Sequence, residues 1–144
     1  MLYIALGEMG MEESHQRIDR TLSGGIMRID VTGGGLPIAK QPVDGKTQGY
    51  TIPRDNPFLN VPGALGEFYA FGLRNPFRFA FDKANGSLWT GDVGSTVWEE
   101  VNVIEKGGNY QFPYDEGGEP ALGFPKPATI QGTEHGPVYT YRHT

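Results

Sequence analysis

The pair Arg74-Asn75 is the first feature of this sequence that could bind a charged ligand. A guanidinium group offers paired, charge-assisted donors to carboxylates, and an Asn side chain adds a donor and an acceptor of fixed geometry. Because Pro76 follows at once, the same residues also suit a structural turn at a strand junction. The pattern alone favours the turn, and an anion-binding role stays open beside it.

Carboxylates stand at two further places where apolar runs begin or end. Glu8 closes the first run of the chain, and Glu99-Glu100 opens a later one. Adjacent residues of a strand point to opposite faces, so Glu99 and Glu100 cannot serve one site together through their side chains. Between these places lies a loop that contains Gly94 and Ser95. Its residue types alone indicate only a glycine-containing turn without a bound metal.

Short strands are expected to position these residues, above all in the stretch 67–110. Phe77, Phe79 and Phe81 recur at the period of two that is typical of a half-buried strand. Asn85-Gly86 then predicts a hairpin, because both residues tolerate the positive φ of a tight turn. Further strands are expected at 2–6, 26–31, 87–90, 99–104 and 138–141, whereas the proline-rich region 36–66 is expected to be irregular.

The composition agrees with an all-β domain. The chain has 144 residues, enough for one core, and its 22 Gly and 11 Pro favour turns and short strands over long helices. With a net charge of -5 and no basic cluster, nucleic acid is not expected as a partner. No apolar run is long enough to span a bilayer. The absence of cysteine excludes disulfides and thiolate metal sites.

A weak internal repeat bears on the architecture. The units 2–8 and 88–92 both contain an apolar-aromatic pair followed by Gly and a carboxylate, and a second strand follows each. Repeated sheet units suit a β-propeller, but an antiparallel sandwich explains the pattern equally well. The chain opens directly in a strand, without the basic region of a signal peptide. We therefore expect residues 1–144 to form a single partial domain, truncated at both ends.

Four motifs in one order carry a family resemblance. They are GLRNPFRF at 72–79, GDVG at 91–94, WEEVN at 98–102 and KGGNY at 106–110. The segments LYIALGE at 2–8, SGGIMRID at 23–30 and IPRDNPF at 52–58 fit as well. In these motifs the chain resembles the soluble quinoprotein glucose/sorbosone dehydrogenase family over roughly residues 2–113, with a looser match at 137–143. Any one motif would be weak evidence, whereas four in order make chance agreement improbable.

The resemblance implies a fold, cofactors and a reaction. The fold is an all-β partial β-propeller, about two blades of six, with antiparallel sheets and long loops. The cofactors are pyrroloquinoline quinone (PQQ) and Ca²⁺. The substrate is an aldose, whose anomeric hydroxyl is oxidised to a lactone while an external acceptor takes the electrons. The remaining propeller blades are expected as partners, and a periplasmic or secreted location follows from the family alone.

The same resemblance assigns site residues. Arg74 and Asn75 match the pair that contacts the quinone, and the backbone carbonyls of Gly94 and Ser95 match those that hold the calcium. Glu100 and the carbonyl of Tyr110 match a possible second calcium site. For Glu100, a solvated carboxylate at a strand start is an equal alternative.

Glu8 matches a carboxylate that orients the family's catalytic histidine. That histidine belongs upstream of Met1, outside this chain, and His15, His135 and His143 do not match its position. His15 and His143 are expected to be surface residues, so Glu8 is expected to have no base to orient within this chain. We therefore predict that the isolated chain is inactive.

Two alternatives to a dehydrogenase fragment remain. One is a non-catalytic propeller module that binds a protein or carbohydrate ligand, as hedgehog-interacting proteins do. The other is a free-standing small β-domain with a sugar-binding surface. A histidine encoded upstream of Met1 and followed by a glycine-rich apolar strand would favour the enzyme, and a cooperative melt of the isolated chain would favour the free-standing domain.

Overall fold

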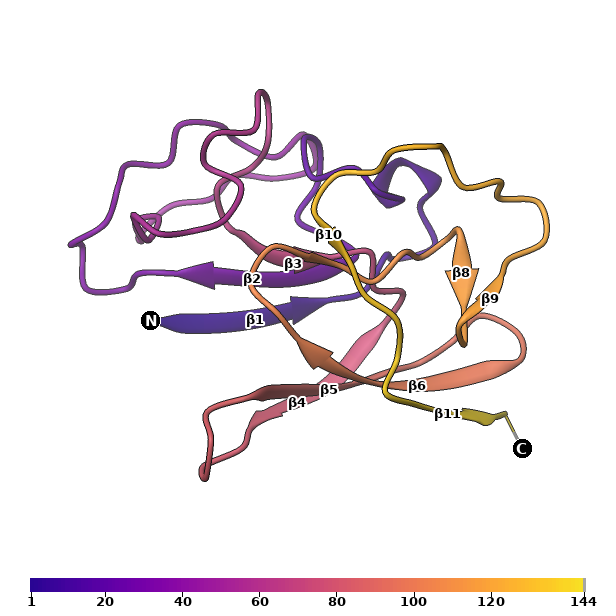
Figure 1. Cartoon of the computed structure of the whole chain (residues 1–144). Helices are drawn as coiled ribbons and strands as arrows, with labels where there is room; N and C mark the ends of the chain where they lie inside the picture. The colour runs from indigo at the N-terminus through magenta and orange to yellow at the C-terminus, as the bar shows by residue number, and fades with distance from the viewer. Residues whose placement is uncertain (144) are drawn as a thin grey trace.

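The computed structural model describes residues 1–143 as two β-sheets joined by long loops (Figure 1). The first sheet has the order β1-β2-β3-β7-β10 and comprises β1 (Leu2–Leu6), β2 (Gly25–Ile29), β3 (Phe68–Phe71), β7 (Gly108–Asn109) and β10 (Thr133–Glu134). The second has the order β11-β6-β5-β4 and comprises β4 (Pro76–Phe81), β5 (Leu88–Asp92), β6 (Trp98–Ile104) and β11 (Tyr139–Arg142). A ribbon of β8 (Asp115–Glu116) and β9 (Glu119–Pro120) and one 3₁₀ turn, η1 (Glu12–Ser14), complete the elements.

The predicted all-β fold class is confirmed. The longer strands pair antiparallel in both sheets, as expected from their alternation. The two-residue strands β7 and β10 instead add to the first sheet in parallel. Strands this short carry no periodicity, so sequence patterning could not predict them. Within residues 1–143, no helix has the length and apolar character needed to cross a membrane.

The predicted hairpin joins β4 to β5. Phe81 pairs with Leu88 across it, and Gly86 takes the left-handed conformation with φ of 78°. The prediction of a half-buried Phe face on β4 is wrong at its ends, because Phe77 is 69% and Phe81 45% exposed. Only Phe79 packs against the core. β4 is the edge strand of its sheet, so one of its sides lacks a neighbouring strand.

Hydrophobic clusters lie on both faces of the first sheet. Alternation along β2 sends Met27 to one cluster and Ile26 to the other. Loop residues close the cluster around Met27, whose buried members are Ile18, Met27, Phe58, Leu65, Phe68 and Phe71. The cluster around Ile26 joins the two sheets, with buried members Ile26, Ala70, Leu73, Leu88, Ile104 and Tyr110. The loops at the strand ends are thereby carried on a rigid base.

The segment 36–66 is irregular, as its prolines predict. It contains only isolated bridges within the described residues, Asp30 with Thr51 and Leu36 with Ile52. Leu65 anchors its end, because its N–H donates to the Ile18 carbonyl at 2.7 Å and its side chain is fully buried.

Candidate functional site

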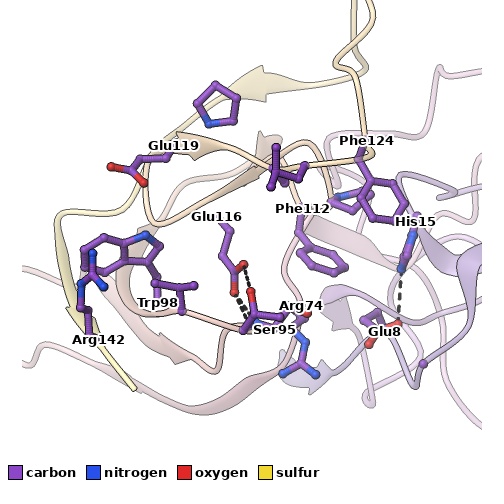
Figure 2. A pocket seen from close by; sticks show the side chains of 17 residues that line it. Glu8, His15, Arg74, Ser95, Trp98, Phe112, Glu116, Glu119, Phe124 and Arg142 are labelled. Carbon is purple, nitrogen blue, oxygen red and sulfur yellow. Dashed lines mark hydrogen bonds and ion pairs between the residues drawn. The ribbon is translucent and has the colours of Figure 1, made fainter. Parts of the chain in front are cut away.

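A cavity of about 800 Å³ opens where the loops after β1, β3, β5 and β7 meet (Figure 2). Its polar wall includes Glu8, His15, Arg74, Ser95 and Glu116. Its apolar wall includes Trp98, Phe112, Leu122 and Phe124. This volume, with largely apolar walls and a few convergent polar groups, is typical of a small-molecule site.

A buried carboxylate of β5 holds the Arg74-Asn75 turn. Asp92 is only 5% exposed and accepts the backbone N–H of Arg74 at 3.0 Å and that of Asn75 at 2.6 Å. Burial raises the pKa of Asp92 to about 7; the N–H of Arg74 opposes this rise, and the neighbouring Glu100 carboxylate adds to it. Both carboxylate oxygens are thus committed to the turn from which the Arg74 side chain departs.

The Arg74 side chain connects this turn to the next loop. Its Nη1 donates to the carbonyls of Val93 at 3.1 Å and Gly94 at 2.6 Å, and the side chain lines the cavity. Asn75 lies elsewhere, with its side-chain oxygen next to Gly7. A Cβ added to that glycine would be only 3.1 Å from Asn75 Oδ1. Of the pair predicted to contact a quinone, the structure therefore places Arg74 in the cavity wall and Asn75 against the end of β1.

Backbone geometry and two carboxylates fix the Gly94-Ser95 loop. A Cβ at Gly94 would lie 1.5 Å from the Trp98 carbonyl, so only glycine fits there. The Gly94 N–H donates to Glu99 at 3.3 Å. Glu116 accepts the N–H of Ser95 and, at 3.1 Å, that of Thr96. Figure 2 shows Glu116 reaching from β8 down to this loop. With its N–H groups bound from outside, the loop keeps a fixed shape.

The backbone carbonyls of Gly94 and Ser95, which are predicted to hold calcium, are hard oxygen donors, but they do not form a complete calcium site. Calcium takes six to eight oxygen ligands. Among residues 1–143, no three His, Cys, Asp or Glu side chains are grouped to hold a metal ion. The Gly94 carbonyl already accepts from the Arg74 cation. The loop therefore fits calcium only if a bound ligand supplies further oxygens and Arg74 withdraws from Gly94.

The side chains of Glu100 and Tyr110, the residues predicted for a second calcium site, have hydrogen-bond partners within the protein. Glu100 accepts the Gly117 N–H at 2.7 Å and the Asn102 amide at 3.1 Å, and burial raises its pKa. The Tyr110 ring lies in the core between the sheets, and its hydroxyl accepts the Glu105 N–H at 2.8 Å. The Glu100 carboxylate thus takes part in the hydrogen bonding of the fold, whereas the atom predicted for Tyr110 is its backbone carbonyl, which the hydroxyl contact does not involve.

Glu8 faces an imidazole of this same chain. Its Oε2 lies 3.4 Å from His15 Nε2, and the two side chains are only 12% and 16% exposed. The expectation that His15 is a surface residue, which leaves Glu8 without an imidazole in this chain, is therefore wrong. Ser14 carried the missed signal, because a hydroxyl one turn after a strand can bond back to that strand's end; here it donates to the Glu8 carbonyl at 2.9 Å.

The other two histidines lie outside the cavity wall. His143 is 36% exposed, and its Nδ1 lies 3.1 Å from Glu99. The His135 ring stacks on Tyr110 with a centroid separation of 5.5 Å. Neither residue lines the cavity, so His15 is the histidine of residues 1–143 that does.

The fold matches a glucose dehydrogenase of the β-propeller type: the apo structure of the soluble aldose sugar dehydrogenase from Escherichia coli matches 96% of this chain and 35% of that one, with a TM-score of 0.66 and 30% identity. The family model described as glucose/sorbosone dehydrogenase matches residues 1–143, and the chain belongs to this family. This confirms the family expected from the four ordered motifs.

Known relatives are considerably longer than this chain. The Escherichia coli protein "Aldose sugar dehydrogenase YliI" is 31% identical over 145 residues, which cover 98% of the chain and 34% of the relative. The "HIPL1 protein" of Arabidopsis thaliana is 42% identical over 100 residues, 68% of the chain and 14% of the relative. The PQQ-bound aldose sugar dehydrogenase structure from Streptomyces coelicolor matches with a TM-score of 0.62 and 29% identity, covering 99% of this chain and 32% of that one. The chain thus spans about a third or less of their length.

Proposed function

We propose that the chain is part of a PQQ-dependent sugar dehydrogenase, which oxidises the anomeric hydroxyl of an aldose to a lactone and passes the electrons to an external acceptor. The observation that supports this most is the cavity, where the Arg74 guanidinium, aromatic walls and the Glu8–His15 pair meet. A flat quinone with several carboxylates matches such a wall, because the guanidinium suits its carboxylates and the rings suit its faces.

Each predicted residue has a task in this proposal. Arg74 binds a quinone carboxylate, and Asn75, whose backbone N–H is held by the same Asp92, would help to orient the quinone once its side chain turns from Gly7 toward the cavity. The carbonyls of Gly94 and Ser95 would hold calcium. When bound, the quinone supplies the hydride acceptor and calcium a Lewis acid beside it.

In this proposal Glu8 serves two imidazoles: its Oε2 faces His15 of this chain, and its other carboxylate oxygen orients the imidazole that takes the proton from the anomeric hydroxyl. In the family, this imidazole belongs to a part of the protein outside residues 1–144. Glu100 and the Tyr110 carbonyl are proposed for an accessory calcium ion, which would require Glu100 to exchange one of its present N–H partners.

Other parts of the propeller complete the site in this proposal. The chain covers 34% of the Escherichia coli relative, so residues 1–144 supply one portion of the cofactor pocket and further blades supply the rest. A periplasmic or secreted location is proposed from the family resemblance.

Calorimetric titration of PQQ into the full product of the gene, with calcium or with a chelator, tests this function. The expected result is calcium-dependent binding. Arg74→Ala should weaken it roughly ten- to 150-fold, the equivalent of a hydrogen bond to a charged group. Arg54→Ala is the matched control, since it removes an exposed cation outside the cavity and should leave binding unchanged. Absence of PQQ binding, or equal losses in both variants, would contradict the proposal.

A non-catalytic binding module is the second candidate. The chain is 42% identical to the Arabidopsis HIPL1 protein over 100 residues, beside 31% identity to the bacterial dehydrogenase over 145 residues, so both kinds of relative match it. A module of this kind would keep the loops and the cavity but would not bind PQQ. The same titration therefore separates the two candidates.

A further inference from the structure

The turn that carries His15 is anchored on both sides of this residue. On one side, the Ser14 hydroxyl lies 2.9 Å from the Glu8 carbonyl and 2.7 Å from the Met11 carbonyl. On the other side, the Gln16 amide donates to the Phe112 carbonyl at 2.7 Å. Because both flanking residues are fixed, the backbone at His15 has little freedom to turn the ring away from the cavity.

Gln16 adds a second anchor through a paired amide contact. Its Nε2 donates to Asn109 Oδ1 at 3.0 Å, and Asn109 Nδ2 donates to Gln16 Oε1 at 2.6 Å. Asn109 is fully buried in β7. The turn after β1 is therefore attached to a strand that lies three positions away in the first sheet. Gln16 takes a positive φ of 57° to make these bonds, a conformation that a non-glycine residue rarely adopts without compensation.

The His15 ring itself has a polar partner and two aromatic neighbours. Glu8 Oε2 faces its Nε2, as Figure 2 shows. The rings of Phe112 and Phe124 meet it edge-on, with centroids 5.1 and 5.7 Å away. Within residues 1–143, no hydrogen bond engages its Nδ1. The cavity therefore holds an oriented imidazole with one ring nitrogen left for a ligand, next to apolar ring surfaces.

We propose that His15 is a sugar-contacting residue, whose imidazole binds a substrate hydroxyl while Glu8 holds the ring. A sugar presents hydroxyls and C–H faces together, and the cavity offers an imidazole beside Phe112 and Phe124 for both. The inference rests on the proposed function, since the sugar is the substrate named there. It adds a binding residue that the four family motifs do not include.

Kinetics of the PQQ-loaded full product with the best aldose test this role. His15→Ala should raise KM about tenfold, which corresponds to the loss of one hydrogen bond. The value of kcat and the PQQ affinity should stay within about twofold, because His15 binds the sugar and not the quinone. His15→Gln serves as a second variant if the alanine variant does not fold. His135→Ala is the matched control, because that histidine stacks on Tyr110 outside the cavity and should leave KM unchanged.

A direct binding readout separates this inference from the proposed function. In NMR spectra, aldose addition should shift the ring resonances of His15, identified by their loss in His15→Gln, and should leave those of His135 in place. A fall in kcat or in PQQ affinity with KM unchanged would overturn the sugar contact, and so would unmoved His15 resonances. If the wild type oxidises no aldose, the dehydrogenase proposal fails. The NMR titration then still decides whether His15 contacts a sugar.

Discussion

Replacing Asp92 by Asn tests whether this buried carboxylate holds the Arg74-Asn75 turn. The carboxylate accepts two backbone N–H groups, one on each oxygen. An Asn side chain has one acceptor oxygen, and its NH₂ group would face the second N–H as another donor. One backbone N–H is therefore left unpaired in a site where Asp92 is only 5% exposed.

The size of the effect follows from that unpaired group. A buried donor without a partner costs about 1–3 kcal/mol. This cost lowers the free energy of local opening of the turn. The backbone amides of Arg74 and Asn75 should therefore exchange with deuterium roughly five- to 150-fold faster. Hydrogen exchange of the peptide that covers residues 72–77, measured in the full product of the gene at a pH above 7, where Asp92 is ionised, gives this rate.

Thr90→Val is the matched control for Asp92→Asn. Thr90 lies on the same strand and is 2% exposed, but its hydroxyl donates to the Arg78 carbonyl at 2.9 Å and not to the turn. The control should leave exchange at residues 72–77 unchanged. If Asp92→Asn also leaves it unchanged, or if both variants accelerate it equally, Asp92 does not hold the turn in the way described.

Three further predictions concern the whole chain. Asp92 keeps its proton up to pH of about 7 in the fold and only to 3.8 when unfolded, so between these pKa values the folded state binds more protons. Its contribution to the free energy of unfolding therefore falls as pH rises through this window. Urea titrations at several pH values should show a free energy of unfolding that declines more steeply with pH in the wild type than in Asp92→Asn. The same pH dependence in both proteins would contradict this. The isolated 144-residue chain should self-associate, because Phe77, Trp89 and Tyr139 of the second sheet are 69%, 40% and 62% exposed; light scattering should show a mass that grows with concentration, and a monodisperse monomer would refute this. The same isolated chain, given PQQ and calcium, should show no sugar-dependent dye reduction, and measurable turnover would refute its predicted inactivity.

Local sequence signals predicted much of the fold. Asn85-Gly86 placed the β4–β5 hairpin, and alternation in 26–31 separated Ile26 from Met27 correctly. These features depend on neighbours in the chain, so composition and spacing contain them. The parallel strands β7 and β10 depend instead on long-range pairing across the first sheet, and two residues give no pattern from which to predict it.

The sequence motifs name candidate site residues, three of which, Glu8, Arg74 and Ser95, line the cavity, but they do not predict the contacts between them. Arg74 lies in the cavity wall, as its proposed ligand role requires. The Glu8–His15 pair was missed because the turn after β1 folds back on the strand end. Asp92 was missed as well, because a carboxylate between Gly91 and Val93 resembles an ordinary loop residue. Only the fold shows that it is buried under the turn it binds.

Reduction of bound PQQ by a sugar is the most direct test of whether the full product of the gene is a sugar dehydrogenase. The full product of the gene is loaded with PQQ and calcium without oxygen or an electron acceptor, and the quinone spectrum is followed while aldoses are added one at a time. At least one aldose should convert bound PQQ to its reduced form, and lactone should appear in equal amount. Bound PQQ that no aldose reduces, or a protein that binds no PQQ, would contradict the assignment of this chain to a sugar dehydrogenase.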